Sequence, residues 1–275
     1  MKQQLKIAVC VKQVPDTGKI KWTENNTIDR THMDSVINPC DEYALEMALD
    51  IKEAYQEKQT HISVFSMGPN KACDVLKYAL ALGCDEGYLI SDKLFLGSDS
   101  YITSKILAQA IKFVYNDDFD IVICGQFAQD GDTAQTGPGI AINLDIPVVT
   151  YVSSLIETDD ESVVVQQNFD DSFNIIKMPL KSLMCVINNN CKLRNPNVLG
   201  YMLSQKKDIK IITANDLGFE KNQVGLKGSP TYVYNAYRFN GDNNREKKIY
   251  NDLSSNNNAK IILKEVQKLF DYYED

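Results

Sequence analysis

The chain has 275 residues, of which 44% are hydrophobic and 24% charged, and its formal net charge at pH 7 is −8. These proportions are typical of a globular protein, and the length suits one large domain with an extension. Because a negative surface repels a polyphosphate backbone, we expect no nucleic acid partner. The apolar runs are far too short for a membrane span, and the first residues do not form a signal peptide, so we expect a cytoplasmic protein.

Side chains suited to nucleophilic or metal chemistry are scarce. The seven cysteines form no CxxC pair, and the two histidines are His32 and His61. Cysteines within apolar runs behave as small hydrophobic residues, so we expect neither a disulfide framework nor a metal site. A Ser-His-Asp hydrolase is disfavoured because the chain contains no GxSxG motif.

Up to about residue 150, short β-branched runs alternate with segments of helical period, which predicts βαβ units on a parallel sheet. The predicted strands are Lys6–Val14, His61–Ser66, Gly87–Ser91, Asp120–Cys124 and Pro147–Val152. The predicted helices are Asp41–Lys58 with Asp41 as its cap, Asn70–Leu82 ending at a left-handed Gly83, and Asp99–Tyr115.

After Val152 the pattern changes. Tyr151–Ile156 and Ser162–Gln167 flank an acidic turn and predict an antiparallel hairpin, and Leu183–Ile187 predicts a return to the main sheet. Residues 204–239 have little periodicity, and the polar stretch Asn240–Asn258 is typical of a linker. Lys260–Tyr273 predicts an amphipathic helix that packs on its own domain or on a partner subunit. We therefore expect one domain over residues 1–203 and an extended arm over residues 204–275.

Ligands of open α/β sheets bind outside the carboxyl ends of the strands, where the strand order reverses. This rule nominates the loops after three predicted strands, which are Gln13–Thr17, Ser66–Pro69 and Gly125–Gly139. The third loop reads GQFAQDGDTAQTGPG, and its glycines permit close backbone approach at the start of a helix. Free amides at a helix N-terminus bind anions such as phosphate. The same sequence also fits a helix start without a ligand, capped by Asp132 or Thr136 and with Pro138 in the first turn.

Two acidic residues of this loop argue against a crowded cluster of phosphates. Asp130 and Asp132 would repel phosphate, and they suit ribose hydroxyls or helix capping better. A paired-carboxylate acid–base role is an alternative, although no activating Lys or His is close in sequence.

Four residues outside this loop have two interpretations each. Lys12 suits the neutralisation of a phosphate or a reduced flavin, or else a solvated strand end. Asn38 and Asp41 suit the edge of a ligand, or else an Asx turn followed by a helix cap. Met67, at a strand end, suits packing better than ligand contact.

Seven motifs in chain order are KIAVCVKQVPDT, INPCDEYALEMAL, VFSMGP, ALALGCDEGYLISD, GSDSYITSKILAQAI, DIVICGQFAQDGDTAQTGPGIAINLDIPVVTYV and VGLKGSP. Together they resemble the electron transfer flavoprotein beta subunit over roughly residues 5–235. The resemblance implies a Rossmann-like α/β fold of the adenine nucleotide alpha hydrolase-like type. It also implies pairing with a homologous alpha subunit, around which the C-terminal arm would wrap.

The resemblance further implies an adenine nucleotide in the nominated loops. The positions that match are Cys10, Asn38, Pro39, Cys40, Asp41, Met67, Ala128, Gln129, Asp130, Gly131, Asp132, Thr133, Ala134, Gln135, Thr136, Gly137, Pro138 and Gly139. We add Lys12 as a candidate contact. Because the redox chemistry of such proteins belongs to the cofactor, no side chain is expected to be catalytic.

Two branches of that family differ in the glycine-containing loop. A loop similar to DGDTAQVGP implies the electron-bifurcating branch, in which the beta subunit holds FAD and accepts hydride from NADH. A loop similar to DDDxNQTGQ implies the branch that holds AMP as a structural ligand. This chain reads DGDTAQTGP, so Gly131, Thr133, Ala134 and Pro138 favour the first branch and Thr136 the second. Cys40 and Phe127 also depart from the usual family pattern.

The bifurcating branch implies a divided electron path. One electron would pass to FAD of the alpha subunit and on to an acyl-CoA dehydrogenase-type partner, and the other to ferredoxin or flavodoxin. The alternatives are a non-bifurcating beta subunit that holds AMP and a stand-alone adenine-nucleotide sensor on the same fold.

Overall fold

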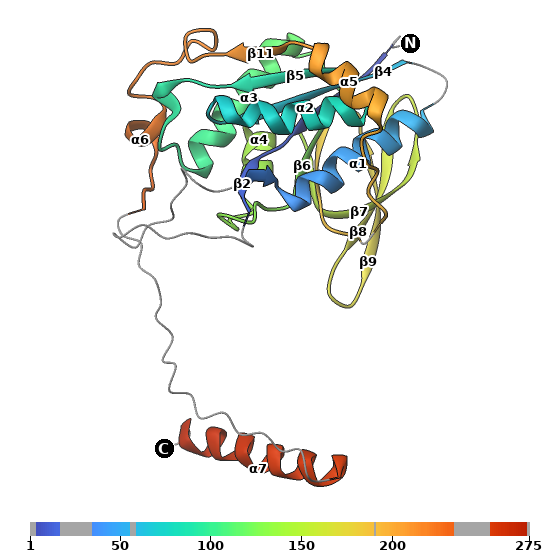
Figure 1. The fold of residues 1–275 in the computed structure, drawn as a ribbon, viewed down its shortest axis with the longest axis vertical. Coiled ribbons are helices and arrows are strands. Elements are labelled where there is room, and N and C mark those ends of the chain that lie inside the picture. Colours follow the sequence, from blue (N-terminus) through green and yellow to red (C-terminus); the bar gives the residue numbers. More distant parts are fainter. Residues whose placement is uncertain (1–3, 17–34, 56–58, 190, 234–253, 274–275) are drawn as a thin grey trace. The chain divides into compact units, whose positions relative to one another are not determined.

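The computed structural model describes residues 4–16, 35–55, 59–189, 191–233 and 254–273. The chain divides into two compact units, Met1–Ala236 and Tyr237–Asp275. The first unit contains a large sheet with helices on both faces, and the second contains helix α7 (Ser255–Tyr273), as Figure 1 shows. Among the described residues, no helix is both long and apolar enough to cross a membrane.

Within the described residues, the main sheet has nine strands in the order β11-β5-β4-β1-β6-β10-β7-β8-β9. In chain order they are β1 (Gln4–Cys10), β4 (Gln59–Met67), β5 (Glu86–Ile90), β6 (Ile121–Gly125), β7 (Val148–Thr158), β8 (Ser162–Asn168), β9 (Phe173–Pro179), β10 (Ser182–Val186) and β11 (Ile209–Ile212). The pairs from β11 to β7 are parallel, whereas β8 and β9 pair antiparallel. This confirms the predicted Rossmann-like, mostly parallel sheet with an antiparallel hairpin.

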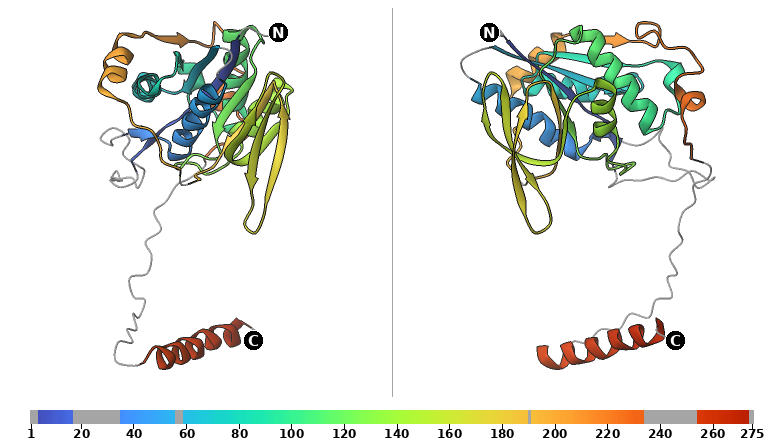
Figure 2. Two further views of the ribbon diagram at one scale, coloured as in Figure 1. Left: turned by 90° about the vertical axis from the view of Figure 1, so that its right-hand side faces the viewer. Right: turned by 180° about the vertical axis from the view of Figure 1, so that it is seen from behind.

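Two helical layers cover the sheet. Helices α1 (Pro39–Ala54) and α2 (Cys73–Leu82) pack on one face, and α3 (Ser100–Tyr115) and α4 (Thr136–Leu144) pack on the other. The view from behind in Figure 2 has α3 and α4 in front of the sheet. The central strands therefore lie between two apolar layers, which is why they read as continuous hydrophobic runs.

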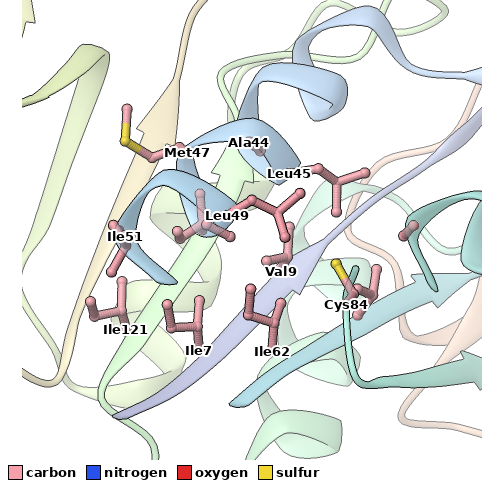
Figure 3. Close-up of a cluster of buried hydrophobic side chains, with 14 of the residues drawn as sticks. Ile7, Val9, Ala44, Leu45, Met47, Leu49, Ile51, Ile62, Cys84 and Ile121 are labelled. Carbon is pink, nitrogen blue, oxygen red and sulfur yellow. The ribbon is translucent and has the colours of Figure 1, made fainter. Parts of the chain in front are cut away.

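The first layer shows how sequence periodicity becomes packing. Ile7 and Val9 of β1 point toward α1, and Leu45 and Ile51 of that helix are fully buried against this face (Figure 3). The alternate β1 residues, Ala8 and Cys10, belong to the cluster on the opposite face. Every second residue of the strand and every third or fourth residue of the helix thus contribute side chains to the same core.

The first predicted strand is wrong in its second half. Residues after Cys10 leave the main sheet, and β2 (Gln13–Pro15) pairs antiparallel with β3 (Ser35–Ile37) in a separate two-stranded sheet. The reason is that the Lys12 backbone is engaged elsewhere. Its carbonyl accepts from the Asn38 amide at 2.9 Å, and its amide donates to Asp41 at 2.7 Å. Thr17, the end of the first nominated loop, lies outside the described residues.

The helix starts also differ from prediction. Helix α1 has Asn38 at its N-cap and Pro39 in its first turn, so Asp41 lies inside the helix and is not its cap. Helix α4 has Gln135 at its N-cap, so neither Asp132 nor Thr136 caps it, although Pro138 does lie in the first turn. Neither N-cap residue makes a side-chain cap hydrogen bond.

Other helix ends agree with the prediction. Asp99 caps α3 by accepting from the Ile102 amide at 3.0 Å. Gly83 ends α2 at φ 122°, a conformation that favours glycine. A 3₁₀ turn, η2 (Asn70–Ala72), forms the first part of the predicted second helix. The predicted end of the first helix, residues 56–58, lies outside the described residues.

Two predicted strands, Pro147–Val152 and Tyr151–Ile156, are one strand, β7. Its first part pairs parallel with β10 and its second part antiparallel with β8. Tyr151, at φ 56°, marks the change, and its amide donates to the Gln126 side chain at 2.8 Å. The predicted hairpin is confirmed, whereas its continuation into β9 was not predicted.

The segment after residue 186 is more ordered than its sequence suggests. Helix α5 (Val198–Lys206) and strand β11 precede the short helix α6 (Gly225–Gly228). Strand β11 pairs with β5 at the edge of the sheet, so the start of the expected arm belongs to the first compact unit. Residues 240–253 lie outside the described residues, as do the side chains of Leu269, Phe270 and Tyr273.

Candidate functional site

Strand order reverses around β1, which lies between β4 and β6. At the carboxyl ends of these strands lies a pocket of about 970 Å³. Loops that follow β1, β4, β5 and β6 line it, together with the first turns of α3 and α4. This is the position at which ligands of open α/β sheets bind.

Most of the predicted site residues converge on this pocket. Those that line it are Cys10, Lys12, Asn38, Asp41, Met67, Ala128, Gly131, Asp132, Thr133, Ala134, Gln135, Thr136 and Gly137. The predicted residues that do not line it are Pro39, Cys40, Gln129, Asp130, Pro138 and Gly139. Two of the nominated loops, Ser66–Pro69 and Gly125–Gly139, therefore contribute to one site, whereas no described residue of Gln13–Thr17 lines it and Cys10 and Lys12 come from the end of β1 and the residues just after it. The role of each residue in binding stays a prediction.

Asn38, just before α1, binds the nominated loop that follows β6. Its side-chain amide donates to the Phe127 carbonyl at 2.9 Å, and its side-chain oxygen accepts from the Gln129 amide at 3.0 Å. The side chain is buried and makes these contacts in place of an Asx cap. Asn38 therefore fixes the start of the loop that follows β6.

Asp41 holds a second junction below the pocket. Its carboxylate accepts from the Lys12 amide at 2.7 Å, and the Asn38 side chain and the Gly125 amide also donate to it. Burial raises the pKa of Asp41 to about 7, against these hydrogen bonds, which lower it. One buried carboxyl thus links the end of β1, the start of α1 and the end of β6.

Lys12, which lines the pocket, forms an ion pair with Asp130. Its Nζ lies 2.6 Å from Oδ1 and 2.8 Å from Oδ2 of Asp130. Both side chains are partly exposed, so the pair contributes little to stability. The contact nevertheless keeps a cationic group at the edge of the pocket.

The backbone of the glycine-containing loop forms a tight turn before α4. The amides of Gly131 and Asp132 donate to the Ala128 carbonyl, and Asp132 and Ala134 adopt φ of 48° and 53°. Such left-handed turns orient successive amides toward one side. Helix α4 then begins at Thr136 without a side-chain cap, and its first residues, Thr136 and Gly137, line the pocket, so the positive end of the helix lies at the pocket.

Two glycines seat α4 against its neighbours. A methyl group on Gly137 would lie 2.4 Å from Sγ of Cys185, and one on Gly139 would lie 2.5 Å from Oγ of Ser104. The first turn of α4 is therefore held close to β10 and α3. The Ser100 hydroxyl adds a hydrogen bond to Gln135 Oε1 at 3.0 Å, which joins the starts of the two helices.

One wall of the pocket was not predicted from the sequence. It consists of the loop after β5, residues 91–100, and includes Asp92, Phe95, Leu96 and Asp99. The signal that was available is the position of this loop directly after a strand of the same sheet.

Contacts from the end of the first unit hold this wall. Asp92 accepts from the Ala214 amide at 3.0 Å, and Asp99 accepts from the Thr231 hydroxyl at 2.7 Å. Burial would raise the pKa of Asp99, but hydrogen bonds from Ile102 and Thr231 outweigh it and lower the pKa. Asp99 is thus an anchored carboxylate at the start of α3.

The pocket has polar and apolar parts. The backbone at the start of α4 and Lys12, which follows β1, lie on one side, and the apolar side chains of Ile90, Phe95 and Leu107 lie on the side of β5 and α3, together with charged Asp92, Lys93 and Asp99. No group of three or more His, Cys, Asp or Glu residues within the described ranges is arranged for a metal ion. The arrangement can bind and orient a ligand with one charged and one apolar part.

Comparison with known proteins decides the family. The model of the electron transfer flavoprotein domain matches residues 25–217. The chain belongs to the electron transfer flavoprotein beta subunit family. It is 44% identical to the electron transfer flavoprotein subunit beta of Thermoanaerobacterium thermosaccharolyticum over 232 residues, 83% of this chain and 86% of that protein.

Two further relatives carry the names of larger complexes. The caffeyl-CoA reductase-Etf complex subunit CarD of Acetobacterium woodii is 38% identical and covers 85% of this chain and 87% of its own length. The acryloyl-CoA reductase electron transfer subunit gamma of Anaerotignum propionicum is 36% identical and covers 85% of this chain and 88% of its own length. The resemblance stated from the sequence motifs is thereby confirmed at the level of the family.

Proposed function

We propose that this chain is the FAD-binding beta subunit of a heterodimeric, electron-bifurcating electron transfer flavoprotein in the cytoplasm. The observation that carries this proposal is the large pocket at the point where the strand order reverses. In it, the N-terminus of α4, which has no side-chain cap, faces the apolar side chains of the β5 and α3 side. FAD bound there would accept a hydride from NADH and release electrons singly. The chain itself binds, orients and shields the cofactor.

The residues present fit an adenosine diphosphate group. The Thr136 and Gly137 backbone at the start of α4 offers amides to a phosphate, and the Thr133 hydroxyl lies in the same wall. Lys12 supplies a positive charge at the pocket edge. Asp132, which lines the pocket, is then left for ribose hydroxyls, and Asp130, which does not line it, holds Lys12.

Pocket size favours a dinucleotide over a mononucleotide. A volume of about 970 Å³ is at the upper end of the range of about 300–1,000 Å³ for small-molecule sites. AMP at the α4 end would leave the space next to Phe95 and Leu107 without a ligand group. An isoalloxazine ring is planar and largely apolar, and it suits that wall.

An exposed apolar surface supports the proposal that a partner protein docks on this chain. On α5, the side chains of Val198, Leu199, Tyr201, Met202 and Leu203 are 49–79% exposed. Arg194 fixes the preceding segment to α1 through ion pairs with Glu46, Asp50 and Glu53. A rigidly held apolar helix face suits docking of the acyl-CoA dehydrogenase-type partner.

We propose that residues 204–275 include the arm that contacts the alpha subunit. Helix α7 has Ile262, Leu263 and Val266 exposed within its own unit, so an apolar surface is free for a partner. Deleting residues 240–275 should abolish co-purification with the alpha subunit while leaving the α/β unit folded. An intact complex after this truncation would contradict the arm proposal.

The experiment that tests bifurcation is an NADH titration of the purified heterodimer. The proposal expects NADH alone to bleach the flavin absorbance. It also expects reduction of ferredoxin or flavodoxin only when the acyl-CoA dehydrogenase-type partner and its oxidised substrate are present. A heterodimer whose flavin is reduced by the dehydrogenase partner but not by NADH would contradict it.

The non-bifurcating alternative, in which this pocket holds AMP, is favoured by one observation. Thr136 is the residue of that branch at the start of α4. In that case the complex would contain AMP in this chain and flavin in the alpha subunit alone.

A further inference from the structure

Three cysteines stand in register across the centre of the sheet. Cys10 of β1 pairs with Cys124 of β6, and Cys124 pairs with Cys185 of β10. All three belong to the cluster under α3 and α4, so their side chains leave the same face of the sheet. All three are free thiols.

Cys10 and Cys124 lie at the floor of the pocket. Cys10 and Cys124 both line the pocket, with 8% and 5% of their surface exposed, whereas Cys185 is fully buried. Their side chains are joined by a hydrogen bond, which with burial raises the pKa of Cys124. Burial also raises the pKa of Cys185 to about 12. Of the three thiols, the pair at Cys10 and Cys124 is therefore the one that a small molecule in the pocket can reach.

The distance between the strands permits a bond. Neighbouring strands are about 4.7–4.9 Å apart, and disulfides span Cα distances of about 4.4–6.8 Å. Residues paired directly across two strands fall within this range. The bond needs a rotation of side chains that already touch.

We propose that Cys10 and Cys124 are a thiol modification site that forms a disulfide with a low-molecular-weight disulfide as oxidant. The Cys10 thiolate attacks one sulfur of the oxidant R–S–S–R, which forms a mixed disulfide and releases R–S⁻. The Cys124 thiol, deprotonated by the first R–S⁻ released, then attacks Cys10 Sγ and displaces the second R–S⁻. Two cysteine thiols are oxidised to one disulfide, two R–SH are formed, and the two thiol protons end on the released R–SH.

Oxidation would reach the ligand site through α4. A methyl group on Gly137 would lie 3.7 Å from Cβ of Cys124 as well as 2.4 Å from Sγ of Cys185, so the first turn of α4 rests directly on this row of thiols. A disulfide draws Cys124 toward Cys10 and so changes the packing under the first turn of α4, whose backbone amides face the pocket. We expect affinity for AMP and FAD to fall by about tenfold or more, equivalent to about 1.4 kcal/mol.

The test uses the full-length chain, freed of bound nucleotide and treated with dithiodipyridine, whose thiol is a good leaving group. Peptide mapping without reduction should find the peptide of Cys10 cross-linked to that of Cys124. Exposed Cys191 serves as an internal control because it should carry a single mixed disulfide. A result in which Cys191 is modified while Cys10 and Cys124 stay reduced overturns the proposal, as does a cross-link between Cys124 and Cys185.

Two variants test whether the disulfide joins Cys10 to Cys124 rather than Cys124 to Cys185. Cys124→Ser should leave a stable mixed disulfide on Cys10, whereas Cys185→Ser should keep the cross-link. Prior addition of FAD or AMP should slow the reaction by about tenfold or more if the ligand covers the pocket floor. Cross-linking without protection supports the thiol site and counts against nucleotide binding in this pocket, so the two proposals fail separately.

Discussion

Gly125 and Asp41 are in such close contact that a methyl group on Gly125 would lie 2.2 Å from Oδ1 of Asp41. The same methyl group would lie 2.9 Å from the backbone carbon of Cys40. The end of β6 can therefore approach the first turn of α1 because residue 125 has no side chain. This approach brings the loop after β6 to the loop after β1, and so forms the pocket.

The first prediction follows from this contact. Gly125→Ala should lower the free energy of unfolding by about 1–3 kcal/mol, as overpacked sites do, because backbone and a buried carboxylate must move. Gly131→Ala is the matched control: nothing lies within 4 Å of its added methyl group, so a change within about 0.5 kcal/mol is expected. Urea denaturation of both variants measures the difference. Equal stability of the two variants would contradict the close packing at Gly125.

The second prediction concerns the buried carboxyl of Asp41. Burial raises its pKa from 3.8 to about 7, so between these pH values the folded state holds a proton that the unfolded chain has lost. Ionisation of Asp41 therefore costs stability, and its contribution to the free energy of unfolding falls as pH rises through this window. Asp41→Asn does not titrate.

The stability of Asp41→Asn relative to the natural chain should thus rise between pH 4 and 7, by up to about 4 kcal/mol, and level off above pH 7. Thermal denaturation in buffers across this range gives the difference at each pH. A difference that is constant across the window would place Asp41 in water rather than in the core.

The third prediction concerns the Lys12–Asp130 ion pair, whose partners should have opposite effects on nucleotide binding. Lys12→Gln removes a charge that neutralises phosphate and should weaken binding of AMP or FAD about 3- to 10-fold. Asp130→Asn removes the competitor for Lys12 and should strengthen binding about 2- to 5-fold. Isothermal titration calorimetry at low and moderate salt measures both. Equal weakening in both variants would mean that the pair clamps the loop and does not meet the ligand.

The fourth prediction concerns Thr133, which lines the pocket between two residues of positive φ. A hydroxyl that donates to a phosphate is worth about 1.5–3 kcal/mol, so Thr133→Ala should reduce FAD affinity roughly 10- to 150-fold. Equilibrium fluorescence titration with FAD provides the constant. Thr133→Ser retains the hydroxyl and should stay near the natural affinity. Unchanged affinity in Thr133→Ala would remove this residue from the proposed phosphate site.

Much of the sheet could be predicted because its central strands are buried on both faces. The runs around Ile7 and Ile121 are continuous and apolar, and α3 repeats its buried positions with helical spacing. The nominated loops followed from the rule that ligand sites lie at carboxyl ends of strands. The carboxyl ends follow from the predicted strands alone, whereas the point at which the strand order reverses follows only from the pairing of the strands in the structure.

The missed features depend on contacts between distant segments. Asn38 bonds Phe127 and Gln129 some ninety residues away, so its sequence neighbours suggested an Asx cap instead. The β5 loop became a pocket wall because β11 pairs beside it and Thr231 binds Asp99. Strand β11 has four residues and lies at the edge, and such a strand has too short a pattern to detect.

The most direct test of the central claim is a count of the cofactors released when the purified heterodimer is denatured. If the pocket at the switch point holds FAD, the count is two FAD and no AMP per heterodimer. One FAD together with one AMP per heterodimer would contradict the account and assign a structural nucleotide to this chain.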